Sequence, residues 1–451
     1  MKRIICLVMA LIVTVTMFAS CGGGETELPK DGKIQLTFYA REFEDWANDH
    51  LRDLVSRFNA ESDTIQVNVK FFTSDTYSDG LTVARENGKA PDLYMLEYGS
   101  LYTHAKNGYA AKLDGLLPQE ALDDIFENVR DMVSLDGNVY AYPWLLEPAT
   151  LFFYRKDILQ ENGIAEPPAT WDELYAACEA IKPTRDLGEY CLGLPVSGAE
   201  YAWITYGMQY NTCDGLAVDE SWLNSNIENP GYKALCEFFY TIYSNGYAPK
   251  AAITSEGYTY IVDALCEGKL AMTFGGSWSI AEIYQYYPEM AEKIGVTVIP
   301  TQSGDSQKTT SGNGGWTYCI SASSKQQEAA AEFLKWMFID DTPRAAEYFL
   351  KAYNSKAPTN ATLQQYLQTA ESEVDPSWTQ VVYDVAARGI PEASYPWDIS
   401  FAVGQMFETM QNSWGSAPFE QLYASALEKA KSTIASVMSR SSYEGNPKYG
   451  K

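Results

Sequence analysis

Apolar and polar residues follow two different periods in the first part of the chain. Residues 34–40 form a short apolar run, and from 46 to 58 the apolar residues recur three to five positions apart, as on one buried face of a helix. Residues 65–72 then alternate strictly between apolar and polar, which is the period of a strand. Strand, helix and strand in this order predict a βαβ opening and a parallel sheet.

Further segments continue the alternation of strands and helices. A buried strand is expected over 90–99 and a helix over 99–107. The glycine-rich segment 311–315 is interpreted as a turn before a strand. The pattern as a whole predicts the α/β class. Later strands are expected at 139–142, 150–154, 192–196, 270–274, 295–299 and 316–321, and the clearest later helices at 171–182, 230–244 and 326–338.

The N-terminus has the pattern of an export signal. A positive start precedes an apolar run over 4–19, which is shorter than the ~20 residues that cross a bilayer. The run ends in small residues followed by Cys21, which resembles the lipobox of bacterial lipoproteins, with Phe18 where that pattern usually has Leu. We therefore expect a signal peptide at 1–20 and a flexible linker at 21–32, lipid-anchored through the Cys21 thiol. The alternative is a secreted protein with a chance cysteine.

Composition narrows the function classes. About 430 residues remain after cleavage, enough for two or three domains. A net charge of −26 argues against nucleic acid as a partner, and against anionic membrane surfaces. With only His50 and His104, the chain is poor material for Ser-His-Asp chemistry. The six cysteines after Cys21 form no CxxC pair, so no metal site and no cofactor are expected, while disulfide pairing stays open.

Several phrases, taken together, resemble one family. They occur in an order that covers nearly the whole mature chain, and they resemble the sugar-type extracellular solute-binding proteins that serve ABC importers. The phrases are KAPDLYMLEYGSLYTHAKNGYAAKLDGLL (89–117), DGNVYAYPW (136–144), TLFFYRKDILQENGIAEPPATWDEL (150–174), CEGKLAMTFGGSWS (266–279), IGVTVIP (294–300) and SGNGGWTYCISASSKQQEAAAEFLKWM (311–337).

The resemblance implies a periplasmic-binding-protein fold, with two α/β lobes, a ligand held between them, and a hinge that the chain crosses about three times. Lobe 1 would comprise 33–145 and 319–370, and lobe 2 would comprise 146–318 and 371–451. The implied partners are a carbohydrate ligand and the permease subunits of an ABC transporter. The protein would lie outside the cytoplasm, with the membrane contacted through the lipid anchor only.

Aromatic residues are the first candidates for sugar contact, because the C–H faces of a sugar pack on aromatic rings. Trp278 follows a strand end in GGSW and matches the loop tryptophan that stacks on sugar in related proteins. Trp316, Trp203 and Trp397 resemble further positions from which aromatics reach the cleft, and Trp144 follows the Tyr-Pro motif of the first hinge crossing. For each residue the alternative is packing inside a lobe.

Carboxylates and their neighbours are the second group of candidates. Glu97 and Tyr98 end a buried strand, where an exposed tip facing the cleft avoids burying an unpaired charge. Glu147 aligns with a sugar-contacting glutamate of maltose-type binders, and its alternative is a hinge salt bridge. Glu44 lies in the loop after the first strand, with Arg41 in the same loop as a rival.

Three glutamates in one cleft raise the question of catalysis. A glycoside hydrolase needs two carboxyls at a defined separation, one of them with a raised pKa, and no spacing here distinguishes an acid from a nucleophile. We therefore assign no catalytic residue and expect binding only, of an oligosaccharide. The alternatives are a non-sugar solute in the same fold, a surface glycoside hydrolase, and a lipoprotein that senses its ligand for a receptor.

Overall fold

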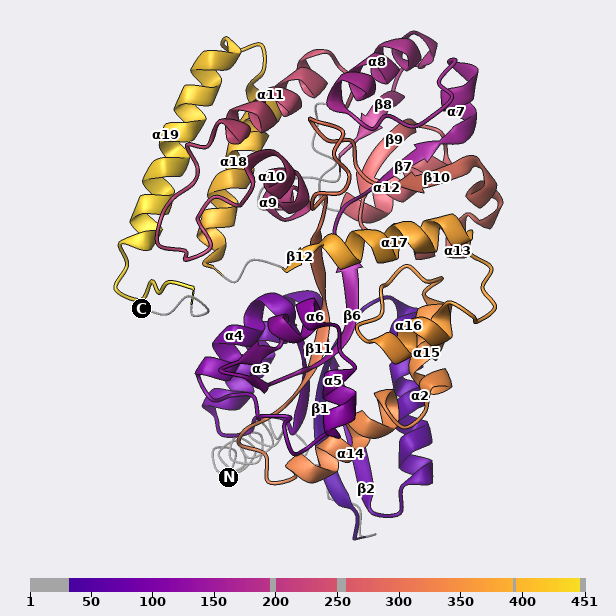
Figure 1. The fold of residues 1–451 in the computed structure, drawn as a ribbon, viewed down its shortest axis with the longest axis vertical. Coiled ribbons are helices and arrows are strands. Elements are labelled where there is room, and N and C mark those ends of the chain that lie inside the picture. The colour runs from indigo at the N-terminus through magenta and orange to yellow at the C-terminus, as the bar shows by residue number, and fades with distance from the viewer. Residues whose placement is uncertain (1–31, 195–199, 250–256, 392–394, 447–451) are drawn as a thin grey trace, which may run out of the picture.

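The computed structural model describes residues 32–194, 200–249, 257–391 and 395–446. The expected signal peptide, Cys21 and nearly all of the expected linker lie outside these ranges. The chain forms two α/β lobes, one above the other in Figure 1, joined by long central strands. The two-lobe fold expected from the sequence is confirmed.

Lobe 1 is built on a six-stranded sheet. Its strands β2, β1 and β3 run parallel, which confirms the βαβ opening, while β11 pairs antiparallel with both β3 and β6. A short β12 pairs with the start of β11. The strands are β1 (Ile34–Arg41), β2 (Ile65–Phe72), β3 (Leu93–Glu97), β6 (Tyr142–Pro148), β11 (Gly312–Ile320) and β12 (Ile390–Pro391).

Helices cover this sheet. α2 (Asp45–Glu61) buries the apolar stripe predicted for it, with Leu51, Val55 and Phe58 in the core. The small hairpin of β4 (Ser134–Leu135) and β5 (Asn138–Val139) precedes β6. The other helices of this lobe are α3 (Ser74–Glu86), α4 (Tyr98–Lys106), α5 (Gln119–Asp123), α6 (Glu127–Met132), α14 (Gln327–Phe338), α15 (Thr342–Lys351) and α16 (Ala361–Leu367).

Lobe 2 has a four-stranded sheet in the order β10-β7-β9-β8. The strands are β7 (Leu151–Arg155), β8 (Tyr190–Gly193), β9 (Leu270–Gly275) and β10 (Ile294–Thr297). The helical turns are α7 (Lys156–Glu161), α8 (Trp171–Ile181), η1 (Lys182–Thr184), α9 (Glu200–Ile204), α10 (Tyr206–Cys213), α11 (Pro230–Ser244), α12 (Gly257–Cys266), α13 (Ser279–Tyr286), η2 (Pro288–Lys293), α18 (Trp397–Ser413) and α19 (Phe419–Met438). α17 (Pro376–Arg388) crosses the junction and contacts β6 below and β10 above (Figure 1).

Local sequence explains where α8 begins. Thr170 precedes the helix and its hydroxyl accepts a hydrogen bond from the Glu173 backbone N–H at 3.1 Å. The Glu173 carboxylate in turn accepts from the Thr170 N–H, which completes a capping box. Trp171, the next residue, is 6% exposed in the lobe 2 core.

The chain passes between the lobes at the β6–β7 junction, along β11, and along the connection from α16 to α17. The lobe boundaries expected at 145/146 and 318/319 fall inside β6 and β11, the two strands that form the hinge. The expected strand at 139–142 corresponds to the end of β5 and the start of β6. Of the strand expected at 192–196, the structure describes β8, and residues 195–196 lie outside the described ranges.

The interpretation of 311–315 as a turn is wrong, because β11 already begins at Gly312. The glycines allow the backbones of β11 and β6 to lie close together, and they do not reverse the chain. At Gly315, where φ is +129°, a Cβ would lie 2.2 Å from the backbone oxygen of Leu145 on β6. The register between the two strands shifts immediately after this point, at Trp316/Thr317.

The six cysteines of the described chain are all free and buried: Cys178, Cys191, Cys213, Cys236, Cys266 and Cys319. Cys178 and Cys191 adjoin, with the Cys191 thiol donating to the Cys178 carbonyl at 3.3 Å. Within the part of the chain that the structure describes, no helix has the length and apolar character required to cross a membrane.

Replacing Gly315 with alanine should lower the free energy of unfolding by about 3 kcal/mol or more, because a Cβ would collide with a backbone atom that cannot rotate away. Gly215→Ala is the matched control, since its Cβ would meet nothing closer than 3.6 Å. Urea denaturation of the two variants measures the difference. Equal stabilities would contradict the role of Gly315 at the hinge.

Candidate functional site

Two of the residues predicted to bind ligand, Glu147 and Trp278, contact a side chain that the sequence did not single out, Lys356. It is 5% exposed in the connection between α15 and α16, and reciprocal backbone hydrogen bonds of 2.9 Å between Ala357 and Leu146 tie that connection to β6. Lys356 Nζ forms an ion pair with the Glu147 carboxylate on β6. The same Nζ lies 5.7 Å from the ring centroid of Trp278, on lobe 2. Lys356 thus joins the hinge to both lobes.

Two of the predicted tryptophans form one aromatic pair on lobe 2. Trp203 of α9 and Trp278, at the start of α13, stack with ring centroids 5.7 Å apart and planes 15° apart. Both side chains are half-buried. Glycines make room for them: a Cβ on Gly276 would lie 2.1 Å from the Trp278 ring, and one on Gly314 would lie 3.3 Å from the Trp203 ring. The GGSW and GNGG segments therefore position an aromatic surface beside the hinge.

A second aromatic group lies on lobe 1, at the carboxyl end of β1. Trp316 meets Phe43 edge-on at 5.3 Å, and the Arg41 guanidinium lies 5.3 Å from the Trp316 ring. Trp144 lies behind Phe43, at 6.3 Å, and packs on Tyr348 at 4.3 Å. Trp144 is only 8% exposed, so in this conformation it supports the Phe43 ring from within the lobe.

Two carboxyls act on one another across the lobes. Glu44 is exposed at the start of α2, whereas Glu282 lies in the first turn of α13 on lobe 2. Burial, followed by the nearby Glu44 charge, raises the pKa of Glu282 to about 7, and Lys356 only partly offsets this. The Glu282 Oε2 atom has no hydrogen-bond partner among the described residues. A buried, unsatisfied carboxyl between two lobes is typical of a binding site.

Sequence reasoning missed both Lys356 and Glu282. For Glu282 a signal existed, because it lies four residues after Trp278 and therefore on the same face of a helix. For Lys356 no local signal existed, since its position depends on strand pairing with β6.

Three predicted residues lie outside this group of contacts. Glu97 is half-buried at the start of α4, and its carboxylate accepts from the Ser100 hydroxyl at 2.8 Å. Tyr98 is 3% exposed, and its hydroxyl donates to the Leu145 carbonyl at 3.2 Å. Trp397 is 46% exposed in the first turn of α18. Their roles in ligand binding stay predictions.

The groups that meet near the hinge suit a polar guest. Across the described ranges no group of three or more histidine, cysteine or acidic side chains is placed to hold an ion. Pairwise contacts bring indole rings next to the Lys356 ammonium and the Arg41 guanidinium, with carboxyls beside them. Such a set can stack on apolar faces and exchange several hydrogen bonds with hydroxyls at once.

Fold and site together define a two-lobe α/β binding protein of the periplasmic type. Two solved structures show the same fold. The sugar-binding protein MalE of Xanthomonas citri superposes with a TM-score of 0.70 at 19% identity, covering 89% of this chain and 98% of that chain. An ABC transporter solute-binding protein of Thermotoga lettingae, solved with α-D-tagatose, gives 0.69 at 23% identity, covering 89% and 99%.

The chain belongs to the bacterial extracellular solute-binding protein family, whose model matches residues 53–380. A putative binding protein of Brucella abortus is 24% identical over 318 residues, or 69% of this chain and 73% of that protein. The mannitol-binding protein of Pseudomonas aeruginosa is 30% identical over 260 residues, or 56% and 57%. The diacetylchitobiose-binding protein of Streptomyces coelicolor is 25% identical over 387 residues, or 82% and 84%. All three of these relatives are described as binding proteins.

The pKa of Glu282 has a consequence for stability. The folded protein holds its proton up to a pKa of about 7, whereas the unfolded chain releases it near the ordinary value of 4.5. Between these two pH values the folded state binds more protons, so the free energy of unfolding contributed by Glu282 falls as pH rises, by up to about 3 kcal/mol.

Glu282→Gln should therefore gain stability relative to the parent protein as pH rises from 4.5 to 8. Urea denaturation across this range measures the difference between the two. Burial lowers the pKa of His50 and of His104 to about 4, which makes stability rise with pH between about 4 and 6.5, but both histidines are common to the two proteins and cancel. A difference that does not change with pH would show that Glu282 is not held in this environment.

Proposed function

We propose that the protein captures a carbohydrate between its lobes and delivers it to an ABC permease. The observation that carries the proposal is the stacked Trp203–Trp278 pair beside the buried Lys356–Glu147 ion pair, at the point where hinge and lobes meet. A sugar offers the matching surface, with C–H faces for the indoles and hydroxyls for the charged groups. Mannitol-binding and diacetylchitobiose-binding relatives support this class of ligand.

Closure of the lobes around the ligand would give the loaded protein a conformation that a permease can recognise. The lobe 1 groups Arg41, Phe43 and Trp316 and the lobe 2 groups Trp203 and Trp278 each contact part of a guest, so both sets act fully only when the lobes are closed. A closed state that binds ligand ~10⁴-fold more tightly than the open state would pass from 1% to 99% of the population. A permease that recognises the closed form then receives loaded protein.

An oligosaccharide is the proposed size class, because aromatic surfaces occur on both lobes and not at a single point. The N-terminal pattern supports a location outside the cytoplasm, with the proposed attachment to the membrane through lipid on Cys21. The net charge of −26 supports a soluble domain at the cell surface and no nucleic-acid partner.

One observation favours a second candidate, a glycoside hydrolase. Glu282 has the raised pKa of a general acid, and Glu44 is a nearby carboxylate. Against catalysis, Glu44 is exposed on lobe 1 while Glu282 lies on lobe 2, so their separation changes with every opening of the hinge. A glycosidase needs two carboxyls at a fixed separation. We therefore propose binding without turnover.

A panel of glucose, mannitol, tagatose, maltose, maltotetraose and diacetylchitobiose tests the proposal by thermal shift and calorimetry, since a tight ligand raises apparent stability by mass action. For the sugars that bind, Trp278→Ala should weaken binding by about 30-fold or more, the loss of one strongly contributing residue. Trp336→Ala is the control, because Trp336 packs between α14 and α2. No shift with any sugar would overturn the carbohydrate proposal, and new reducing ends after incubation would favour the hydrolase.

Cys21→Ser should move the protein from the detergent phase to the aqueous phase when bacteria expressing the full chain are extracted and partitioned in Triton X-114. Serine has no thiol to accept the diacylglycerol, and the folded lobes are unchanged. Immunoblotting of both phases gives the measurement, with Cys319→Ser as the matched control for a cysteine inside the domain. Partition of both variants into the detergent phase would contradict anchoring at Cys21.

A further inference from the structure

A cavity of about 600 Å³ is lined by α2 and α15 of lobe 1 and by α13 of lobe 2. Trp46 of α2 and Tyr353, just after α15, line it from lobe 1, and Gln285 of α13 lines it from lobe 2. The connection from α16 to α17 forms the remaining wall through Glu371 and Glu373. None of the residues predicted from the sequence reaches this cavity.

The cavity continues the candidate site along two helices. Trp46 follows Glu44 by two residues on α2, and Gln285 follows Glu282 by three on α13, which is one helical turn on the same face. α13 begins just after Trp278 and reaches the cavity at Gln285, while α2 reaches it at Trp46 and Asp49. A guest that passes the carboxyl pair therefore enters a space that both lobes line.

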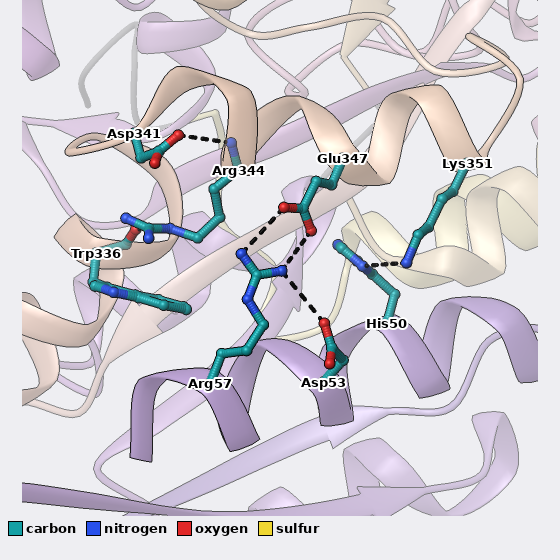
Figure 2. A network of polar contacts seen from close by, with 8 residues as sticks. All are labelled: His50, Asp53, Arg57, Trp336, Asp341, Arg344, Glu347 and Lys351. Atoms are coloured by element: carbon teal, nitrogen blue, oxygen red, sulfur yellow. Dashed lines mark hydrogen bonds and ion pairs between the residues drawn. The ribbon is translucent and has the colours of Figure 1, made fainter. Parts of the chain in front are cut away.

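The lobe 1 wall is held rigidly by polar contacts between α2 and α15 (Figure 2). Arg57 makes two hydrogen bonds to the Glu347 carboxylate, at 2.8 and 3.1 Å. One turn away, Lys351 Nζ lies 3.3 Å from His50 Nδ1. Burial and the Lys351 charge lower the pKa of His50 to about 4, so at neutral pH the imidazole accepts the hydrogen bond from Lys351. A wall fixed in advance needs little ordering when a ligand binds.

Tyr353 occupies a position that suits glycine better. Its φ is +51° and that of Asn354 is +48°, so two consecutive residues adopt the left-handed conformation. Such a residue costs on the order of 1–3 kcal/mol unless it is glycine. The Tyr353 ring stacks on Tyr284 of lobe 2, with centroids 5.4 Å apart and planes 15° apart, and it lines the cavity. A side chain kept at such a position indicates a use for the ring itself.

The charge at the cavity restricts the guest. Asp49, Glu371 and Glu373 are exposed carboxylates on its lining. Lys351 is the cation among the ten lining residues, and it already contacts His50. An anionic guest would meet like charges here, whereas neutral hydroxyls or an amine would find acceptors.

We propose that this cavity is a second sugar subsite, with Trp46 and Tyr353 as its stacking surfaces, for the distal units of a neutral or amine-bearing oligosaccharide. The inference rests on the proposed function and adds to it the chain length and the charge of the oligosaccharide ligand. Binding should therefore strengthen from disaccharide to tetrasaccharide, and a uronate oligomer of equal length should bind more weakly than its neutral counterpart.

Calorimetry with maltose, maltotetraose, diacetylchitobiose and tetraacetylchitotetraose tests the chain length. For the series that binds, Trp46→Leu should reduce the tetrasaccharide affinity by about tenfold, the loss of one stacking surface, and leave the disaccharide affinity within about twofold. Tyr353→Gly should do the same. Because glycine relieves the left-handed strain at this position, a lost affinity in that variant cannot be assigned to unfolding.

Trp336→Leu is the matched control, since it removes an indole that packs on the far half of α2, away from the cavity. Digalacturonate and tetragalacturonate test the charge, with Glu371→Gln/Glu373→Gln expected to improve tetragalacturonate binding. Equal affinities for disaccharide and tetrasaccharide, or a chain-length gain that survives both Trp46→Leu and Tyr353→Gly, would overturn the second subsite alone. Failure of every sugar to bind would overturn the proposed function as well.

Discussion

The buried Lys356 ammonium is the interaction on which the arrangement of the site depends. Removing an ammonium from water costs several kcal/mol unless charge and hydrogen bonds compensate for it. Here the compensation comes from Glu147 on the hinge strand β6 and from the face of Trp278 on lobe 2. Lys356 therefore fixes how a hinge strand and a lobe 2 loop sit relative to each other. Loss of the Glu147 carboxylate would leave the Lys356 ammonium buried without a counter-charge.

The Glu282 carboxyl has the opposite effect to Lys356, because it disfavours contact between the lobes. Its carboxyl is buried near Glu44 of the other lobe, which makes approach of the lobes less favourable when both are ionised. The candidate site thus contains one charge pair that draws its elements together and one that separates them. A ligand whose hydroxyls donate to Glu282 or Glu44 lessens the second effect without disturbing the first. That differential gain is what a binding protein needs to couple occupancy to closure.

What could be predicted from the sequence depended on how far apart along the chain the interacting residues lie. The βαβ opening, α8 and α11 follow from local periodicity and capping, and the tryptophan loop at Trp278 follows from a contiguous motif. Lys356 could not be found, because its role comes from pairing with a strand more than two hundred positions earlier. The glycines at 311–315 were misinterpreted because a glycine that permits a turn and one that permits close backbone contact have the same local sequence.

The buried position of Tyr98 has a related cause. β3 ends at Glu97 and α4 begins at Tyr98 with no intervening loop, so the ring turns inward against Gly315 instead of remaining at the strand tip. That packing in turn makes Gly315 necessary, since a Cβ there would lie 3.1 Å from the Tyr98 ring. A residue expected to meet ligand thus supports the hinge strand that carries Trp316. Burying Tyr98 holds the lobe 1 aromatic surface in place, while the lobe 2 surface is held by the stacking of Trp203 on Trp278 within that lobe. The two halves of the site are therefore fixed by separate interactions, which allows the hinge to move without dismantling either surface.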